Sequence, residues 1–140
     1  MRNREYLSYF NLSQDPFSRE IGVEKLLMLP SVERSLAAAE LLVETHGIGV
    51  MTGRSGTGKS CLLRLLIDRL QPGLCKSYYV CHTSVAIVEF YTHLCDVFGL
   101  DPGHRRASMF RAIKDHILTR RTSSRIHPVL IIDEAHLLNN

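Results

Sequence analysis

The sequence lacks the marks of a membrane protein, a secreted protein or a zinc module. No apolar run approaches the roughly 20 residues that a membrane-spanning helix needs, and the chain does not open with the charged-then-apolar layout of a secretory signal. The cysteines form no C-x-x-C pair, so buried, reduced thiols are favoured over a zinc site built from Cys81, His82, His93 or Cys95. We therefore expect a cytoplasmic protein.

Internal repeats and low-complexity tracts are also missing, as expected for one globular domain. The chain has 140 residues, 45% of them hydrophobic, and a net charge of +3, so it can bury a core. Residues 1–30 differ from the rest because Tyr6, Tyr9, Phe10 and Phe17 make them aromatic without a clear period. We expect residues 1–30 to form an arm that packs on a core spanning residues 31–140.

The most informative stretch matches the phosphate-binding pattern G-x-x-x-x-G-K-[ST]. Glycines allow the backbone N–H groups to approach phosphate oxygens at the positive end of the following helix. In this chemistry Lys59 contacts the β- and γ-phosphates, and the Ser60 hydroxyl binds Mg²⁺. The alternative is a glycine-rich turn that opens an ordinary helix. The predicted nucleotide-binding residues are Gly53, Arg54, Ser55, Gly56, Thr57, Gly58, Lys59, Ser60 and Cys61.

The residues around this loop predict a strand before it and a helix after it. The apolar run at residues 48–52 is typical of a buried parallel strand, whose carboxyl end is where ligands bind in open α/β sheets. After the loop, leucines and an isoleucine between residues 62 and 70 predict a helix that packs against a sheet and ends before Pro72.

A second candidate motif lies near residue 133. The apolar residues 129–132 predict a buried strand, and Asp133 and Glu134 follow directly. Asp133 is positioned to assist Mg²⁺, and Glu134 to polarise the water that attacks the γ-phosphate, so Glu134 and Lys59 are the predicted catalytic residues. An acidic pair in a solvated loop is the alternative. His136 completes Asp-Glu-Ala-His, which leaves a helicase as a weaker hypothesis.

Between the two motifs the pattern alternates as in an α/β domain. Residues 77–81 predict a strand, and Thr83 or Ser84 is a candidate cap for a helix that runs to Phe98. Upstream, Ser31 is a candidate cap for a helix through residue 45. A further helix is predicted from four apolar residues at helical spacing, which are Ala107, Phe110, Ile113 and Ile117.

Positive charge is concentrated between residues 105 and 125, where seven basic side chains face Asp115 alone. This local charge of +6 can neutralise nucleic-acid phosphates, although a solvated helix is an equally ordinary explanation. No aromatic residue alternates with the basic ones as in a stacking surface, so we expect any DNA contact to be electrostatic. The candidate DNA-binding residues are Arg105, Arg106, Arg111, Lys114, Arg120, Arg121 and Arg125.

Together these segments resemble the AAA+ ATPases grouped with secretion-pathway protein A and with transposition helpers (ExeA/TniB-like). The likeness rests on Tyr9-Phe10-Asn11-Leu12 with Asp15-Pro16-Phe17, on Leu27-Met28-Leu29-Pro30, and on the GRSGTGKS and LIIDEAHLL segments. It implies an α/β P-loop NTPase fold of the AAA+ (ASCE) type, a parallel sheet with flanking helices, that binds ATP with Mg²⁺ and hydrolyses it. The glycine loop corresponds to Walker A and the acidic strand to Walker B.

The resemblance also implies partners. Transposition members form homo-oligomers on DNA and recruit or activate a transposase, and we take a DNA-transposition helper as the leading hypothesis. A secretion-pathway ATPase and a nucleotide-binding fragment without turnover are the alternatives. The arm near Pro16 and Phe17 is expected to help enclose the adenine.

The same family carries a polar sensor, an arginine finger and a helical lid downstream of Walker B, and its sheet has the strand order 5-1-4-3-2. Residues 31–140 are therefore expected to be an incomplete core in which the Walker A and Walker B strands are not neighbours.

Overall fold

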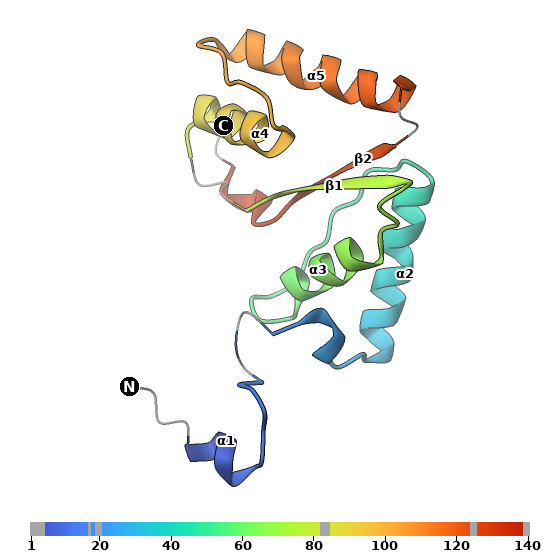
Figure 1. Cartoon of the computed structure of the whole chain (residues 1–140), viewed down its shortest axis with the longest axis vertical. Coiled ribbons are helices and arrows are strands. Elements are labelled where there is room, and N and C mark those ends of the chain that lie inside the picture. The colour runs from blue at the N-terminus through green and yellow to red at the C-terminus, as the bar shows by residue number, and fades with distance from the viewer. Residues whose placement is uncertain (1–4, 17, 19–20, 82–84, 124–125, 139–140) are drawn as a thin grey trace.

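A small parallel sheet lies at the centre of the computed structural model, which describes residues 5–16, 18, 21–81, 85–123 and 126–138. Its two strands are β1 (Cys75–Val80) and β2 (His127–Ile132). They pair in register from Cys75 opposite His127 to Val80 opposite Ile132. Figure 1 shows helices on both sides of this pair, which gives a mixed α/β arrangement.

The helices α4 (Ile87–Phe98) and α5 (Arg106–Ser123) cover one face of the sheet, and α2 (Pro30–Glu44) and α3 (Lys59–Arg69) lie against the other (Figure 1). Three shorter helices complete the described chain: α1 (Glu5–Tyr9), η1 (Val23–Lys25) and η2 (Ala135–Leu137). α4 ends where the sequence predicts, because Gly99 adopts a left-handed φ of 70° that closes the helix.

Successive side chains of β1 point to opposite faces, so the strand contributes to two cores. Tyr78 and Val80 are buried against α4 and α5, where Cys95, Phe98 and Met109 complete the cluster.

The other core lies between the sheet, α2 and α3. Leu36 of α2 is fully buried there, among Leu62, Leu65 and Leu66 of α3 and Ile131 of β2. The leucines of α3 thus hold the helix against the sheet, and this contact fixes where the glycine loop lies.

The predicted buried strand at residues 48–52 is wrong. This segment has no strand assignment, and the side chains of Ile48 and Val50 are 97% and 88% exposed. A strand needs a hydrogen-bonding partner, and within the described ranges β2 pairs with β1 and with no second strand. The segment is therefore an exposed connection from α2 to the glycine loop.

Two helical predictions also need correction. In α5, the predicted positions Ile113 and Ile117 do pack in the core. Phe110 is 55% exposed and Ala107 is exposed too, whereas Met109 is buried, because the core covers the stripe that contains Met109. The N-cap of α2 is Leu29, two residues before the predicted cap, so the helix begins at Pro30 and Ser31 lies inside its first turn. The candidate caps Thr83 and Ser84 lie outside the described residues.

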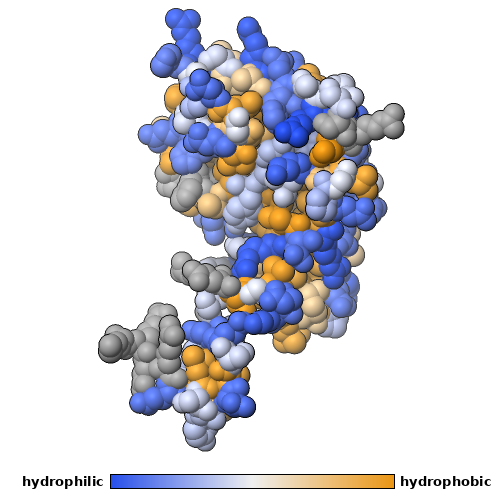
Figure 2. All heavy atoms as spheres, in the orientation of Figure 1, coloured by the Kyte–Doolittle hydropathy of each residue, from blue (hydrophilic) through white to orange (hydrophobic). Residues whose placement is uncertain are grey.

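The arm at residues 1–30 divides into two parts. Val23, Leu26 and Met28 pack on the α2–α3 core, and Arg64 of α3 donates a 2.6 Å hydrogen bond to the carbonyl of Ile21. By contrast, α1 stands away from the body of the molecule (Figure 1), and apolar atoms show on its surface in Figure 2. Tyr9, at its end, is 82% exposed.

All cysteines are free thiols, but they are not uniformly buried as predicted. Cys95 is buried, Cys61 and Cys75 are half-buried, and Cys81 is exposed. No three side chains of the metal-ligating types come together among the described residues. His82 lies outside those residues. In the same part of the chain, no helix combines the length and apolar character that crossing a membrane requires.

Candidate nucleotide-binding site

The glycine loop adopts a backbone conformation that is sterically unfavourable for residues with a Cβ atom. Gly56 and Gly58 have φ values of 80° and 86°, in the left-handed region that glycine adopts without a steric cost. Gly58 then serves as the N-cap of α3, and its carbonyl accepts the N–H of Leu62 at 2.9 Å. The first N–H groups of α3 have no partner within the helix, so the loop ends at an anion-attracting helix terminus.

The side chain of Lys59 folds back onto the backbone of the glycine loop. Its Nζ donates hydrogen bonds to the carbonyls of Gly53 at 3.0 Å and Arg54 at 3.1 Å. Thr57 Oγ1 also donates to the Arg54 carbonyl, at 2.9 Å, and so closes the turn. The loop thus holds a positive charge at its centre, beside the start of α3.

A network of hydrogen bonds joins the loop helix to the end of β2. Ser60 Oγ donates to Asp133 Oδ2 at 2.6 Å, and Tyr79 of β1 donates its phenolic hydrogen to the same oxygen at 2.7 Å. The backbone N–H of Glu134 donates to Asp133 Oδ1 at 2.9 Å. The structure therefore brings together Ser60 and Asp133, the two residues that the sequence predicts for the metal.

This environment changes the acidity of two groups. Burial alone would raise the pKa of Asp133, but the hydrogen bonds from Ser60, Tyr79 and Glu134 and the charge of Lys59 outweigh burial and lower the pKa. The pKa of the Tyr79 hydroxyl is raised, first by burial and then by its hydrogen bond to the Asp133 carboxylate. Asp133 is thus an ionised acceptor at neutral pH, and Tyr79 a neutral donor.

The side chain of Glu134 lies at the surface, whereas its backbone N–H belongs to the network. Its backbone is left-handed, with a φ of 52°, which is uncommon outside glycine and typical of turns and functional sites. Its carboxylate lies 3.3 Å from Nδ1 of His136, which makes an ion pair when the imidazole is protonated. The side chain is accessible to water, as a general base for hydrolysis must be.

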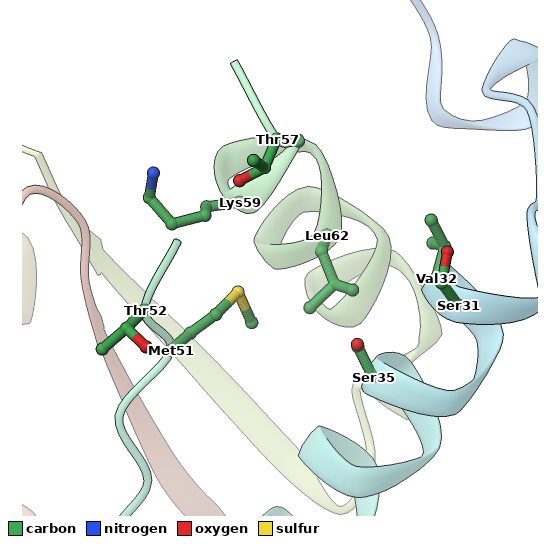
Figure 3. A pocket seen from close by; sticks show the side chains of 9 residues that line it. Ser31, Val32, Ser35, Met51, Thr52, Thr57, Lys59 and Leu62 are labelled. Atoms are coloured by element: carbon green, nitrogen blue, oxygen red, sulfur yellow. The ribbon is translucent and has the colours of Figure 1, made fainter. Parts of the chain in front are cut away.

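A cavity of about 190 Å³ opens beside the loop. In Figure 3 the side chains of Ser35, Met51 and Leu62 point toward one another across it, and Lys59 extends away from them. Whole ligand pockets measure roughly 300–1,000 Å³, so this space suits part of a nucleotide. Its lining comprises Ser31, Val32, Ser35, Met51, Thr52, Thr57, Gly58, Lys59 and Leu62.

The remaining predicted site residues that the structure describes lie outside the hydrogen-bond network and do not line the cavity. Ser55 is an exposed part of the turn, and Cys61 is half-buried in the first turn of α3. Pro16 of the arm is exposed and does not line the cavity, and Phe17 lies outside the described residues.

Two contributions were not predicted from the sequence. One is the α2 wall of the cavity, formed by Ser31, Val32 and Ser35, and the other is the hydroxyl of Tyr79. For Tyr79 the alternation of β1 was a usable signal, because it sends this side chain to the face opposite Tyr78. Its distance from Asp133 depends on strand pairing, which the sequence does not give.

The oxygen donors at this site are of the kind that Mg²⁺ prefers. Ser60 offers a hydroxyl and Asp133 an ionised carboxylate, and Mg²⁺ binds through few protein oxygens and keeps several waters. The donor set therefore fits the ion that accompanies nucleotide phosphates.

Residues 42–140 match the protein family described as AAA domain, which is well over half of the chain. The chain belongs to the AAA domain family. Membership confirms the predicted P-loop NTPase fold, and AAA domains typically bind ATP with Mg²⁺. No curated protein and no solved structure matches the chain.

Proposed function

We propose that this AAA domain binds ATP with Mg²⁺ at residues 53–61 and hydrolyses it. The observation that carries the proposal is the 2.6 Å hydrogen bond between Ser60 and Asp133, which joins the two motifs at one place. The loop supplies phosphate-binding N–H groups, and the strand end supplies carboxylates next to them.

In the proposed mechanism each residue has a distinct role. Lys59 leaves the carbonyls of Gly53 and Arg54 and binds the β- and γ-phosphates, whose charge attracts it more strongly. Ser60 and Asp133 would hold Mg²⁺, and the bound ion would neutralise charge on the phosphates. Glu134 accepts a proton from the attacking water, because its carboxylate is exposed and follows Asp133 directly. The cavity beside the loop receives part of the nucleoside.

The binding step is tested with Lys59→Ala. Loss of a charge-assisted contact costs about 1.5–3 kcal/mol, so affinity for a fluorescent ATP analogue should fall roughly 10- to 150-fold. The matched control is Lys76→Ala, which removes an exposed lysine of β1 far along the strand from Asp133. Equal affinity of the Lys59 variant and the control would contradict the assignment of the phosphate site.

We further propose that the protein acts on DNA through α5, as a transposition helper that forms homo-oligomers and works with a transposase. The support for DNA contact is a row of exposed basic side chains, and in Figure 2 hydrophilic side chains project from the end of the molecule that α5 occupies. Arg111, Lys114 and Arg121 are exposed on this helix. Phe110 is 55% exposed, and its ring lies edge-on against Tyr91 of α4, so the proposed DNA contact remains electrostatic.

Support for the transposition role itself is the resemblance of residues 9–17 to the branch of the family that includes the helper ATPases, since the two motifs are common to P-loop ATPases in general. The test measures ATP turnover with and without DNA in the presence of a transposase, and the transposition role predicts that DNA stimulates turnover. The secretion alternative predicts turnover that DNA does not change. Of the other predicted DNA-binding residues, Arg105, Arg106 and Arg120 are exposed, and Arg125 lies outside the described residues.

A further inference from the structure

Tyr79 has a position that neither sequence motif accounts for. It lies on β1, and the alternation of the strand directs it to the α3 side of the sheet, where its ring packs on the cluster of Leu62, Leu65 and Leu66. Its hydroxyl extends beyond that cluster and donates to Asp133 Oδ2 at 2.7 Å. Asp133 itself is 8% exposed, so this contact is largely shielded from solvent.

We infer that Tyr79 is a positioning residue for the magnesium site, and that its hydroxyl fixes the orientation of the Asp133 carboxylate toward Ser60. This inference rests on the proposed function, because it assigns a role within the same nucleotide site. It adds to the site a third structural element, β1, which lies between the two motifs in the sequence and belongs to neither.

The hydrogen bonds of Asp133 explain why one more donor matters. An ionised carboxylate has about four acceptor positions, and the Ser60 hydroxyl, the Tyr79 hydroxyl and the Glu134 N–H occupy three of them. Without Tyr79, the Ser60 hydroxyl would be the sole side-chain donor to Asp133 among these three contacts. Ser60 would still hold Oδ2 and the Glu134 N–H would still hold Oδ1, but the carboxylate would be held less firmly about its terminal bond, which is a soft torsion.

Mg²⁺ is sensitive to such freedom, because it demands near-ideal octahedral geometry and gives up its waters reluctantly. A carboxylate held from both oxygens presents its remaining acceptor capacity in a fixed direction. Residues that orient metal ligands in this way typically contribute 10- to 100-fold to metal affinity. The Tyr79 hydroxyl is therefore expected to strengthen the Mg²⁺-dependent part of nucleotide binding and leave the metal-free part unchanged.

The competing explanation is that Tyr79 only fills the α3 core. Tyr79→Phe separates the two, because it keeps the ring and removes the hydroxyl. Tyr78→Phe is the matched control, since it removes a hydroxyl from the adjacent residue on the opposite face of the same strand, 3.5 Å from His116 and away from the loop.

The experiment measures the affinity of each full-length variant for a fluorescent ATP analogue, once with Mg²⁺ and once with EDTA. The dissociation constant with EDTA divided by the dissociation constant with Mg²⁺ reports how strongly metal and nucleotide binding are coupled. We expect Tyr79→Phe to reduce this ratio about tenfold and to keep the EDTA value within twofold of wild type. Tyr78→Phe should leave both values unchanged. Replacing Tyr79 with 4-aminophenylalanine, which keeps a ring and a donor, should restore most of the coupling.

Three results would overturn the inference and leave the proposed function standing. An unchanged ratio in Tyr79→Phe would show that the hydroxyl does not assist the metal. An equal loss of affinity with Mg²⁺ and with EDTA, or failure of 4-aminophenylalanine to restore the ratio, would assign Tyr79 to packing. A wild-type protein that binds no nucleotide would reject the proposed function together with the inference, and so differs from a failure of the inference alone.

Discussion

Ser60 Oγ lies 2.6 Å from Asp133 Oδ2, although 73 positions separate the two residues in the sequence. The contact joins the first turn of α3 to the end of β2, so it aligns the glycine loop with the acidic strand. Such preorganisation matters for phosphoryl transfer, in which positioning and electrostatics supply most of the catalysis.

Glu134→Gln is expected to stop ATP turnover and to leave binding intact. Glutamine keeps the shape of the side chain but cannot accept the proton, and a general base typically contributes about 10²- to 10⁴-fold to the rate. Phosphate release should therefore fall at least about 100-fold, with nucleotide affinity within twofold. Normal phosphate release by this variant would remove Glu134 from the mechanism.

His136→Ala serves as the companion of that variant. It frees the Glu134 carboxylate from the imidazole, which lies 3.3 Å away. Because the pair is exposed, we expect only a small change in turnover. A loss as large as that of Glu134→Gln would instead give His136 a direct role.

Gly58→Ala is expected to destabilise the protein and weaken ATP binding. Gly58 has a φ of 86°, and a Cβ in the left-handed region costs about 1–2 kcal/mol, although the space around it is open. Thermal unfolding and nucleotide titration measure the two effects. The matched control is Gly73→Ala, where the space is equally open and φ is not in the left-handed region. Similar losses in both variants would contradict a conformational requirement specific to the loop.

The Asp133 carboxylate is expected to make stability depend on acid pH. Its pKa is lowered in the folded protein from the ordinary value of 3.8, so its stabilising contribution is complete above that value. The contribution disappears as the pH falls through the folded-state pKa. Urea unfolding between pH 5 and pH 3 should therefore show a steeper loss of stability for wild type than for Asp133→Asn. Asp115→Asn, on the exposed side of α5, is the control, and equal slopes for wild type and Asp133→Asn would contradict the prediction.

Removing Arg111 and Lys114 together should weaken DNA binding and its salt dependence. Each phosphate contact contributes about 0.9 to the slope of log affinity against log salt, so the double Ala variant should lose a slope of about 2. The matched control replaces one exposed arginine and one exposed lysine elsewhere, Arg34 and Lys76. If both pairs change DNA affinity equally, α5 is a solvated surface and not a DNA contact.

The local parts of this protein were predictable from contiguous residues. The helix after the glycine loop, the strand before Asp133 and the end of α4 at Gly99 follow from apolar spacing and glycine chemistry. The helix α5 was also predicted, but only part of its buried face was, because Ile113 and Ile117 reach the core and Ala107 and Phe110 do not. Met109 and Ile113 face the core and Phe110 faces solvent, because the position of α4 decides which stripe of the helix is covered.

For the apolar segment 48–52, too, the sequence did not predict whether the side chains are buried. Its composition favours a buried strand, yet Ile48 and Val50 are exposed, since no strand within the described ranges lies beside them. A hydrophobic segment favours burial, but its side chains are buried only where another helix or strand packs against them.

By itself the sequence determined which chemical groups the candidate site contains, because the glycines, Lys59 and Ser60 form one unbroken motif and two acids directly follow one strand. Tertiary structure alone decided that Asp133 meets Ser60, that Tyr79 binds the same carboxylate oxygen, and that Glu134 remains exposed beside His136. The physical reason is that a motif fixes which groups are close along the chain, whereas distances across the molecule depend on how the strands pair and how α3 packs on them.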